Sequence, residues 1–472
     1  MELKDTPSLI KKRLQRVLLV RPDLLGTPYA ISKFGVKHQP MGLFYMASPL
    51  LKKGFDVRYC DEILLDDFEK AVTEYKPDFI GISVSSPLFH RAKKLVSIAK
   101  KYNCITGLGG PHITAEPEIA LQESNADFGV IGESEIVLPE ILQGESIEEL
   151  NGVVYWKNGE VKVKERTCYI EDLDSLPFPA REIAEMDRYH GDTEFGFHIH
   201  PRERMIRLIT SRGCAFHCTF CARHRIFGRK TRKRHPENIL DEMDYTHDKY
   251  NASYFTLMDD TFTEDARHVE GFCSEILKRN RKYTWCAYSR VDTDPAVFKL
   301  MYDAGCRMIE FGVETGSQTV LDSIKKGITV DEIKQGFNNA KKAGMKTKAF
   351  FMVGLPAEGP VELKESINLA KAINPHYLWL SIFLPLPGSE IYEGIAKGDK
   401  IDFSRESFFH THSKDLNRSH RRFMLDFYVR YAYIKQFLTS LTWSEFAYFA
   451  NTAMSFAKIS LSSRLHGQKH SS

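Results

Sequence analysis

The sequence lacks an apolar run long enough to cross a membrane. A spanning helix needs about 20 consecutive apolar residues. The most apolar segment, YLWLSIFLPLPG at 377–388, is shorter and is interrupted by Pro385 and Pro387. The first fifteen residues, MELKDTPSLIKKRLQ, have no apolar stretch of the kind found in secretory signals. We therefore expect a cytoplasmic protein with no transmembrane segment.

The chain also lacks a strong excess of charge of either sign. Its 65 Lys and Arg nearly balance its 62 Asp and Glu, which leaves a formal net charge of +3. Composition alone therefore does not indicate binding to nucleic acid or to a membrane. In a cytosolic chain of 472 residues, the nine cysteines are better explained as metal ligands or buried thiols than as disulfides.

The first 145 residues alternate strand-like and helical segments. The strand-like runs are continuously apolar, as in strands covered on both faces: RVLLVR (16–21), DVRYCD (56–61), FIGISVS (79–85), CITGLGG (104–110) and FGVIGE (128–133). This alternation is typical of a doubly wound parallel sheet, which binds ligands at the carboxyl ends of its strands. The loops GISVSS and GLGGPH fall there, and their glycines suit a ligand cradle and a plain turn equally well.

A hairpin and a linker follow this unit. GVVYWKNGEVKVKE (152–165) has alternating segments around Asn158-Gly159, a dipeptide that type I′ turns favour. The segment DLDSLPFPAREI (172–183), with two prolines and several acids, reads as a linker.

A second series of strands and helices begins near residue 204. Six segments read as strands: RLITSRG (207–213), YFTLMDD (254–260), TWCAYSR (284–290), MIEFGVETG (308–316), TKAFFMVGLP (347–356) and YLWLSIFLPLPG. They predict a partial or full parallel barrel with its site at the carboxyl ends of the strands. From about residue 404 the chain is helical and rich in aromatics. We interpret this part as helices that cap the barrel, in preference to a membrane or lipid-binding surface.

Three cysteines, Cys214, Cys218 and Cys221, lie within eight residues, and no fourth cysteine accompanies them. A structural zinc site usually takes four ligands, and His217 or His224 is near enough in sequence to supply the fourth. Thiolates are also the usual ligands of iron–sulfur clusters, and three of them on a four-iron cluster leave one iron open. An open position is what a catalytic centre needs. The pattern therefore favours iron–sulfur over zinc, and zinc over unpaired core thiols.

The spacing Cys-x-x-x-Cys-x-aromatic-Cys, with Phe220 as the aromatic residue, resembles the signature loop of the radical SAM enzymes. In that family S-adenosylmethionine (SAM) chelates the open iron. The reduced cluster then cleaves SAM to a 5′-deoxyadenosyl radical. The resemblance thus implies that Cys214, Cys218 and Cys221 hold a [4Fe-4S] cluster and that the fourth ligand is the cosubstrate. The protein positions this chemistry and excludes competing reactions.

The resemblance extends along the barrel segments. Phe220, Arg290 in YSRVD, and Glu314 and Ser317 in EFGVETGSQ match positions from which the family contacts SAM. GLPAEG (354–359) and PLPGSEIY (385–392) match the ends of the fifth and sixth strands. Asp259 and Asp260 in LMDDTF match an acidic motif near the site. Each match is weak alone, and their order and spacing together carry the assignment.

The first unit resembles the cobalamin-binding domain that precedes many radical SAM barrels. The matching segments are PMGLFYMASPLLKKGFDV, IGISVSS, GLGGPHITAEPE and FGVIGESE, and the loops that match the cobalamin contacts contain Ser83, Gly109, Gly110 and His112. The Asp-x-His-x-x-Gly motif that places a histidine on cobalt in many cobalamin proteins is absent, although His38 is present in that loop. The resemblance implies bound cobalamin, and the alternative is a retained scaffold that serves packing or substrate recognition.

The sequence leaves two reactions open. Cobalamin would direct the radical chemistry to methylation of an unactivated carbon or phosphorus. A radical oxidative cyclisation or rearrangement, as in the resembling anaerobic magnesium-protoporphyrin monomethyl ester cyclase group, is the alternative without bound cobalamin. A tRNA methylthiotransferase would need three more clustered cysteines, and Cys60, Cys104 and Cys168 are scattered.

The alternative from another functional class is a zinc-bound nucleic-acid-binding module. Its best support is the basic segment ARHRIFGRKTRKRH (222–235), but a solvated loop explains this segment better.

The sequence therefore predicts an α/β protein of four parts. These are a doubly wound cobalamin-type domain (1–145), a hairpin and linker (146–203), a partial parallel (β/α)6 radical SAM barrel (204–395) and a helical C-terminal extension (396–472). The expected partners are a small-molecule or lipid-like substrate and an electron donor such as flavodoxin or ferredoxin, with no nucleic acid. The aromatic C-terminal helices also allow a peripheral membrane contact. The sequence does not identify the substrate, and it does not indicate which residue donates a proton or quenches a radical.

Overall fold

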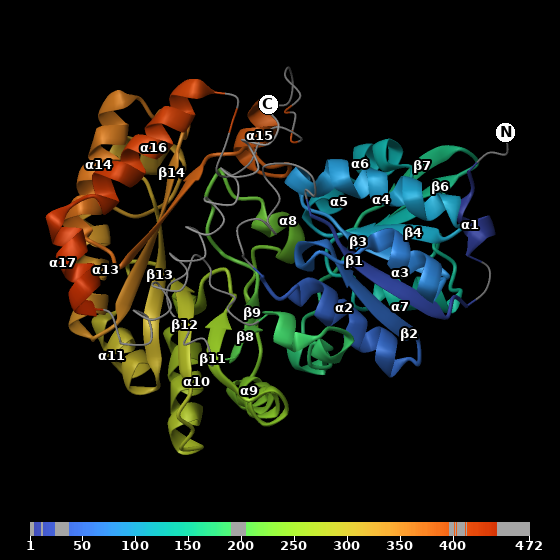
Figure 1. Cartoon of the computed structure of the whole chain (residues 1–472), viewed down its shortest axis with the longest axis horizontal. Coiled ribbons are helices and arrows are strands. Elements are labelled where there is room, and N and C mark those ends of the chain that lie inside the picture. Colours follow the sequence, from blue (N-terminus) through green and yellow to red (C-terminus); the bar gives the residue numbers. More distant parts are fainter. Residues whose placement is uncertain are drawn as a thin grey trace, which may run out of the picture.

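The computed structural model describes residues 4–10, 13–23, 37–189, 204–395, 401, 403, 411 and 413–440. Two α/β units lie side by side, and the helical segments near the C-terminus pack on the second of them (Figure 1). Parts of the predicted linker and of the predicted C-terminal extension, including SEFAYFANTAMSFAKI, lie outside the described residues.

The first unit is built on a seven-stranded sheet with the strand order β2-β1-β3-β4-β5-β6-β7. Strands β1 to β5 are parallel, which confirms the predicted doubly wound sheet, and β6 and β7 are antiparallel. The strands are β1 (Arg16–Arg21), β2 (Asp56–Asp61), β3 (Phe79–Ser83), β4 (Ile105–Gly109), β5 (Phe128–Val130), β6 (Val153–Lys157) and β7 (Glu160–Lys164). The predicted hairpin is the β6–β7 pair. It extends this sheet, and both residues of its Asn158-Gly159 turn have positive φ angles, as a type I′ turn requires.

Helices cover both faces of this sheet, which is why its central strands, such as β1 and β3, are buried almost throughout. Leu18 and Ile80 belong to the core on one face, and Val17 and Leu19 belong to the core on the other. The helices of this unit are α1 (Thr6–Leu9), α2 (Met41–Lys52), α3 (Phe68–Tyr75), α4 (Phe89–Lys101), α5 (Pro111–Ala115), α6 (Pro117–Ser124) and α7 (Val137–Gln143).

The second unit is an open barrel of six parallel strands in the order β15-β14-β13-β12-β11-β8. Strands β8 and β15 stand at its two edges, so the barrel is partial, as predicted. The strands are β8 (Arg204–Leu208), β11 (Ala252–Leu257), β12 (Thr284–Ser289), β13 (Cys306–Glu314), β14 (Lys346–Val353) and β15 (Tyr377–Ile382). The helices are α9 (Pro236–Tyr250), α10 (Ala266–Lys278), α11 (Pro295–Asp303), α12 (Gln318–Ser323), α13 (Val330–Lys342), α14 (Pro360–Ile373) and α15 (Glu390–Ile395).

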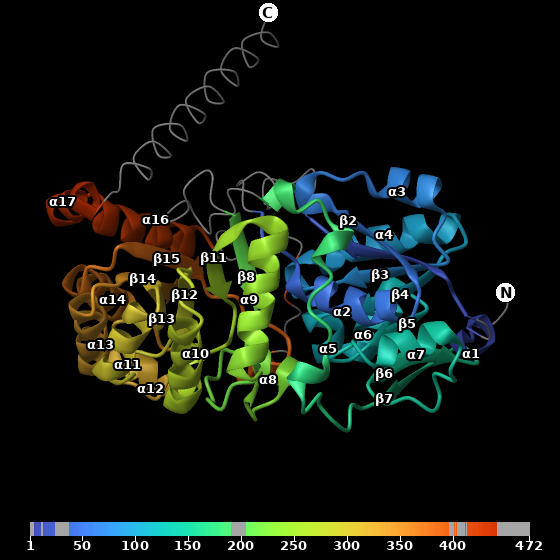
Figure 2. The ribbon, with the colours of Figure 1, turned by 90° about the horizontal axis from the view of Figure 1, so that it is seen from below.

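The helices between strands pack on the outer face of the barrel (Figures 1 and 2). Helix α13 illustrates why these segments are helical. Thr329 and Glu332 form a capping box at its start, its first turn is acidic, its last turn is basic, and Ile333 and Phe337 are buried on one side. The burial of such stripes joins the helices and strands into one large apolar core.

Short elements complete the chain. A two-stranded antiparallel ribbon, β9 (Ser211–Arg212) with β10 (Arg232–Lys233), and the helix α8 (Arg223–Phe227) lie between β8 and α9. Helices α16 (Lys414–Tyr428) and α17 (Tyr431–Ser440) pack on the barrel through Phe423, Phe427 and Tyr433. The 3-10 segments are Glu62–Leu64, Ser86–Leu88, Leu173–Ser175, Arg181–Ile183, Met186–Tyr189 and Phe262–Glu264.

The described part of the C-terminal extension is therefore a helical cap on the barrel. In that part of the chain and in the other described segments, none of the helices combines the length and apolarity that crossing a membrane requires.

Candidate active site

The loop with the three cysteines leaves the barrel at the carboxyl end of its first strand, immediately after β9. Gly213 starts the loop with φ +100°, and a Cβ at this position would lie 2.4 Å from the carbonyl oxygen of Lys230. Glycine is therefore required there, because any side chain would meet both backbone strain and a backbone clash. The turn directs the chain from the ribbon into the cysteine loop.

Backbone hydrogen bonds hold the loop against two later segments of the barrel. The Thr219 N–H donates to Ile324 O at 3.0 Å, and the Ile391 N–H donates to Thr219 O at 3.1 Å. The side chain of Phe220 packs beside Val320, Ile324 and Leu355. The cysteine loop is thus bonded to the end of α12 and to α15, the helices that follow the fourth and sixth barrel strands, although the sequence separates these segments by more than 100 residues.

The three thiols lie in a partly buried and cationic setting. Burial raises the pKa of Cys214, Cys218 and Cys221, in the last case to about 11. The positive charges of Lys326 and Arg290 oppose this effect at Cys218, and that of Arg223 opposes it at Cys221. Nearby cations stabilise thiolates, and they offset the negative charge that three thiolate ligands carry.

The described residues contain no three His, Cys, Asp or Glu side chains placed to hold a single metal ion. Three free thiols on one short loop, surrounded by cations, suit the larger iron–sulfur cluster. The donor set therefore fits the cofactor that the sequence predicts.

Arg290 lies beside the cysteine loop at the end of β12. Its guanidinium is 3.9 Å from the centre of the Phe216 ring, and it pairs with Asp292 at 3.1 Å. It also donates to the carbonyl oxygens of Lys326 and Gly327. The side chain is only 12% exposed, so its position is set before any ligand binds.

Glu314 ends β13 and forms a buried ion pair with Lys326, a residue that the sequence analysis did not single out. The two charged groups are 2.7 Å apart, and each side chain is 11% exposed. Glu314 has φ +70°, which is rare for a residue with a side chain. A Cβ on Gly312 would lie 2.6 Å from Glu314 Oε1 and 2.9 Å from Lys326 Nζ, so this glycine makes room for the pair.

Ser317 is placed differently from the other predicted SAM residues. It is 3% exposed and precedes α12, and its backbone N–H donates to Thr315 Oγ1 at 3.2 Å. Ser366 on α14 accepts a hydrogen bond from the Gly316 N–H and bonds with Thr315. The structure therefore brings Phe220, Arg290 and Glu314 together around Lys326, and places Ser317 in a buried turn behind them.

The two acidic residues after β11 have separate environments. Asp259 is buried and accepts hydrogen bonds from the backbone of Thr210 and Ser211, so it ties β11 to the segment before the cysteine loop. Burial raises the pKa of Asp259 to about 6. Asp260 pairs with Arg223, which follows Cys221 by two residues, and the second carboxylate oxygen of Asp260 is buried without a hydrogen-bond partner.

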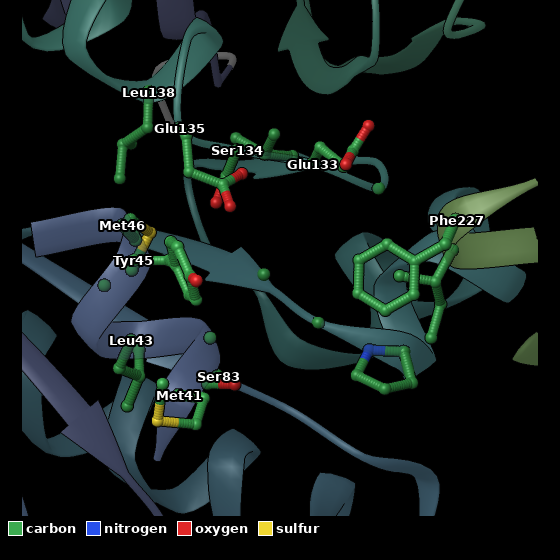
Figure 3. Close-up of a pocket in the computed structure, with 18 of the residues that line it drawn as sticks. Met41, Leu43, Tyr45, Met46, Ser83, Glu133, Ser134, Glu135, Leu138 and Phe227 are labelled. Atoms are coloured by element: carbon green, nitrogen blue, oxygen red, sulfur yellow. The ribbon is translucent and has the colours of Figure 1, made fainter. Parts of the chain in front are cut away.

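A cavity of about 360 Å³ lies between the two units at the carboxyl ends of the first sheet. Its walls on the side of the first unit come from α2 and from the ends of β3, β4 and β5, and Figure 3 shows Phe227 facing it from the barrel side. Arg207, Arg212, Arg223, Met258 and Asp260 also line it from the barrel side. The cavity therefore reaches from the first sheet to the residues that flank the cysteine loop.

Three of the four predicted cobalamin residues line this cavity, namely Ser83, Gly109 and Gly110. A Cβ on Gly109 or on Gly42 would meet nothing within 4 Å, so both glycines leave open space toward the cavity. A flat, bulky ligand such as a corrin ring requires a broad surface of bare backbone. The cavity wall thus fits the cofactor that the sequence predicts.

His112 does not belong to the cavity lining, in contrast to its prediction as a cobalamin contact. Its ring lies 4.2 Å from that of Phe89, and its Nδ1 is 3.1 Å from Ser86 Oγ. The residue is 4% exposed, and burial lowers its pKa to about 4. His112 is therefore a neutral core residue behind the loop whose glycines line the cavity.

Buried ion pairs join the two units beside the cavity, and the sequence analysis did not find them. Arg212 of the ribbon donates to Glu133 at 2.7 Å and to Glu135 at 2.6 Å, and Arg232 donates to Glu133 at 2.8 Å. All four side chains are at most 7% exposed. Glu133, Glu135 and Arg212 line the cavity as well, so one group of charges shapes its wall and connects it to the strand that leads into the cysteine loop.

Comparisons with known families match both units. Residues 208–370 match the radical SAM superfamily, and residues 29–142 match the B12 binding domain. An uncharacterized methyltransferase of Pyrococcus horikoshii is 30% identical over 395 residues, which cover 81% of this chain and 83% of that protein. The anaerobic magnesium-protoporphyrin IX monomethyl ester cyclase of Rubrivivax gelatinosus is 29% identical over 415 residues, which cover 83% and 72% of the two chains.

Solved structures share the fold at lower identity. The radical SAM methyltransferase TsrM from Kitasatospora setae, with cobalamin and a [4Fe-4S] cluster bound, superposes with a TM-score of 0.66 at 17% identity and covers 81% of this chain and 75% of its own. The cobalamin-dependent radical SAM enzyme OxsB, with aqua-cobalamin and SAM bound, has a TM-score of 0.64 at 21% identity and covers 81% and 55%. Both have the arrangement of units described above.

Proposed function

The chain belongs to the radical SAM superfamily, in the group that carries a B12-binding domain, and from this premise we propose that it is a cobalamin-dependent methyltransferase. The cofactors of this group are a [4Fe-4S] cluster, SAM and cobalamin. When bound, they supply a 5′-deoxyadenosyl radical and a transferable methyl group. The proposed substrate is a small molecule with an unactivated carbon.

One observation carries the proposal more than any other. The cavity between the units is lined by the glycine loop of the first sheet and also by Arg223, which follows Cys221 by two residues, and by its ion-pair partner Asp260. A methyl donor held on the first sheet would therefore face the site at which SAM is cleaved. Proximity of this kind removes much of the entropic cost of bringing reactants together.

In this proposal the residues around Lys326 bind SAM. Arg290, fixed by Phe216 and Asp292, has a guanidinium suited to a carboxylate. The Glu314–Lys326 pair lies at the end of β13. Glu314 can accept a hydrogen bond from a hydroxyl group of the ligand, and Lys326 can donate one to its carboxylate. Phe220 packs under Lys326 and excludes water from this side of the loop.

The residues of the cavity wall hold the cobalamin in this proposal. Ser83, Gly109 and Gly110 provide the flat surface at the end of the first sheet. The unpartnered oxygen of Asp260 is an acceptor for an amide N–H of the ligand's periphery, since a buried carboxylate oxygen without a partner is costly. The lining contains no histidine among the described residues, so this wall does not supply an imidazole to cobalt.

An electron donor is a required partner, because a radical SAM enzyme needs a reductant for each cleavage. We propose a flavodoxin or a ferredoxin for this role and the cytoplasm as the compartment. Exposed cations lie beside the cysteine loop, namely Arg229 and Arg225, the latter paired with Glu393, and a basic surface of this kind suits an acidic redox protein.

The test measures metals and SAM-derived products from anaerobically purified protein supplied with cobalamin. About four irons and one cobalt per chain are expected. After reduction, both 5′-deoxyadenosine and S-adenosylhomocysteine should form, the latter being what remains when SAM gives up its methyl group. Iron with 5′-deoxyadenosine but neither cobalt nor S-adenosylhomocysteine would replace methylation with cyclisation or rearrangement. Zinc without iron would overturn the enzyme assignment.

A matched pair of variants locates the cobalamin site. Gly109→Leu places a side chain in the cavity and should reduce the bound cobalt at least tenfold while iron is unchanged. Gly394→Leu is the control, because a Cβ there also meets nothing within 4 Å but the residue lies on α15, outside the cavity lining. Equal cobalt in both variants would remove the cavity from the proposal.

A further inference from the structure

Helices α16 and α17 present an apolar face that the barrel does not cover. Five large hydrophobic side chains are strongly exposed here, four on the two helices and Val429 between them: Leu425 (51%), Val429 (72%), Tyr431 (80%), Ile434 (46%) and Leu438 (61%). On an α-helix Leu425 lies on the side opposite to Phe423 and Phe427, which are buried against the barrel. In α17, Tyr431 and Leu438 likewise lie on the side away from the buried Tyr433. We call this exposed side the outer face of α16–α17. Exposed apolar groups gathered in this way usually mark an interaction surface.

The same face carries a marked excess of positive charge. Its exposed basic residues are Lys414, Arg418, Arg421, Arg422 and Lys435, and the exposed acidic residue of the two helices is Asp415. Five cations and one anion leave a net charge of +4 on these exposed residues. Two of the five cations have an acidic neighbour, since Arg418 pairs with Asp415 at 2.9 Å and Arg422 lies 3.8 Å from the half-buried Asp426. The whole chain has a net charge of only +3, so the excess is local.

Polar contacts fix both helices on the barrel in one orientation. His420 Nε2 lies 3.0 Å from the Leu380 carbonyl oxygen, and the Tyr428 hydroxyl donates to Leu378 O at 2.8 Å. In α17 the Tyr433 hydroxyl donates to His376 O at 3.1 Å. The outer face is therefore a rigid feature of the barrel unit, and Figure 2 shows both helices at its outer margin.

The mixture of aliphatic and basic residues indicates the kind of partner. Helices that lie in the membrane interface combine an apolar stripe with Lys and Arg on the flanks, and anionic lipid adds about 1 kcal/mol for each cation near the surface. Interfaces between proteins are instead depleted of Lys at their centre and use aromatic anchors. A buried core position is excluded by the exposure of the five apolar side chains.

We propose that the outer face of α16–α17 binds the surface of an anionic lipid membrane and holds the enzyme there as a peripheral protein. The apolar side chains insert at the level of the acyl chains, and the basic side chains contact the phosphate groups. This inference depends on the surface alone and is independent of the reaction that the enzyme catalyses. Binding through this face would also bring the barrel close to molecules dissolved in that membrane.

Co-sedimentation of the full-length, cofactor-loaded protein with vesicles tests the proposal. Vesicles of three parts phosphatidylcholine to one part phosphatidylglycerol should sediment the protein. Vesicles of phosphatidylcholine alone should sediment it at least tenfold less well, because they lack the electrostatic attraction. Added salt should weaken the binding to the anionic vesicles.

Matched variants assign the binding to these helices. Leu425→Glu combined with Leu438→Glu should reduce binding at least tenfold, and so should Arg421→Glu combined with Arg422→Glu. Leu277→Glu is the control, because Leu277 is 50% exposed on α10 and lies on another face. All of these positions are exposed helix residues, where Glu is a good helix former, so the variants should fold.

The outcomes separate the alternatives. Absence of vesicle binding by the wild-type protein would overturn the proposal, as would equal binding by the Leu425→Glu/Leu438→Glu variant and the Leu277→Glu control. Self-association that the double variant abolishes, without any vesicle binding, would replace the lipid by a second copy of the chain. Failure of methyl transfer would not affect any of these measurements, because sedimentation does not depend on turnover.

Discussion

The carboxylate of Glu314 and the ammonium group of Lys326 form an ion pair 2.7 Å long beside the cysteine loop. Burial alone would lower the pKa of Lys326, but the attraction of Glu314 raises it, so the lysine stays charged in a site shielded from water. The pair joins the end of β13 to the turn before α13. It combines a buried donor and a buried acceptor at the place where the cosubstrate is expected.

Replacement of Glu314 should therefore weaken SAM binding. Glu314→Gln removes the charge and should raise the dissociation constant of SAM about tenfold, as measured by equilibrium dialysis of the cluster-loaded protein. Glu310→Gln is the matched control, since Glu310 lies on the same strand and pairs with Lys348 at 2.9 Å, farther from the cysteine loop. If both variants bind SAM as the wild type does, Glu314 is not part of the SAM site.

Loss of one cysteine should abolish the cluster without unfolding the protein. Cys218→Ala should reduce iron from about four per chain to near zero and remove reductive SAM cleavage, while its circular dichroism spectrum stays unchanged. The control is Cys273→Ala, a buried thiol of the barrel core, which should keep its iron and lose roughly 1 kcal/mol of stability. A Cys218→Ala protein that still cleaves SAM would refute the assignment of the cluster ligands.

The turn at Gly213 should be intolerant of any side chain. Gly213→Ala adds a Cβ 2.4 Å from a backbone oxygen at φ +100°, which should cost more than 2 kcal/mol and impair iron loading. Gly54→Ala also places alanine at a positive φ, +78°, but its Cβ meets only the Arg13 side chain at 3.7 Å. Chemical denaturation of both variants should show a cost of about 1 kcal/mol for the control. Equal costs would mean that the chain relaxes around Gly213.

Breaking the ion pairs between the two units should destabilise the protein strongly. Arg212→Met leaves Glu133 and Glu135 buried with one partner fewer, and the expected loss is about 3 kcal/mol. Asp303→Asn, which breaks the exposed Lys299–Asp303 pair, should cost less than about 1 kcal/mol. Urea titrations monitored by fluorescence would measure both. A small loss at Arg212 would show that water enters the interface.

Glu358 should make stability depend on pH. Burial raises the pKa of this carboxyl to about 7, above its ordinary value of 4.5. The neutral form is therefore favoured in the folded state, and its contribution to stability is present below pH 4.5 and is lost as the pH rises through 7. Between pH 5 and pH 8 the unfolding free energy of the Glu358→Gln variant should therefore fall less than that of the wild type, by on the order of 2 kcal/mol. An unchanged pH profile would contradict this assignment, and the exposed Glu365→Gln is its control.

Much of the fold could be predicted from the sequence, because strands and turns leave patterns among neighbouring residues. The apolar runs of β1 and β3 and the Asn158-Gly159 turn each reflect neighbouring residues, and the structure has the predicted elements there. The structure also joins the hairpin to the first sheet through the antiparallel pairing of β5 and β6. That pairing depends on contacts between distant segments, which periodicity does not encode.

The candidate site could be predicted only in part, because several of its contacts join residues far apart in the sequence. Spacing within one loop predicted Cys214, Cys218 and Cys221 as cluster ligands. The pairing of Glu133 with Arg212 spans 79 residues, and no local pattern distinguishes these two charges from solvated ones. The sequence also could not show the direction of the His112 side chain, which lies in the core beside Phe89 and Ser86 and not in the cavity lining.

The buried charges between the units also limit how this protein could have been assembled or can be divided. A barrel expressed alone would expose Arg212 and Arg232 without their acidic partners, and the first unit alone would expose Glu133 and Glu135. Each half would then carry like charges with no compensation on a surface shaped for close packing. Neither unit can therefore be exchanged for a homologous one unless the replacement carries the charged residues that pair with the unit that remains.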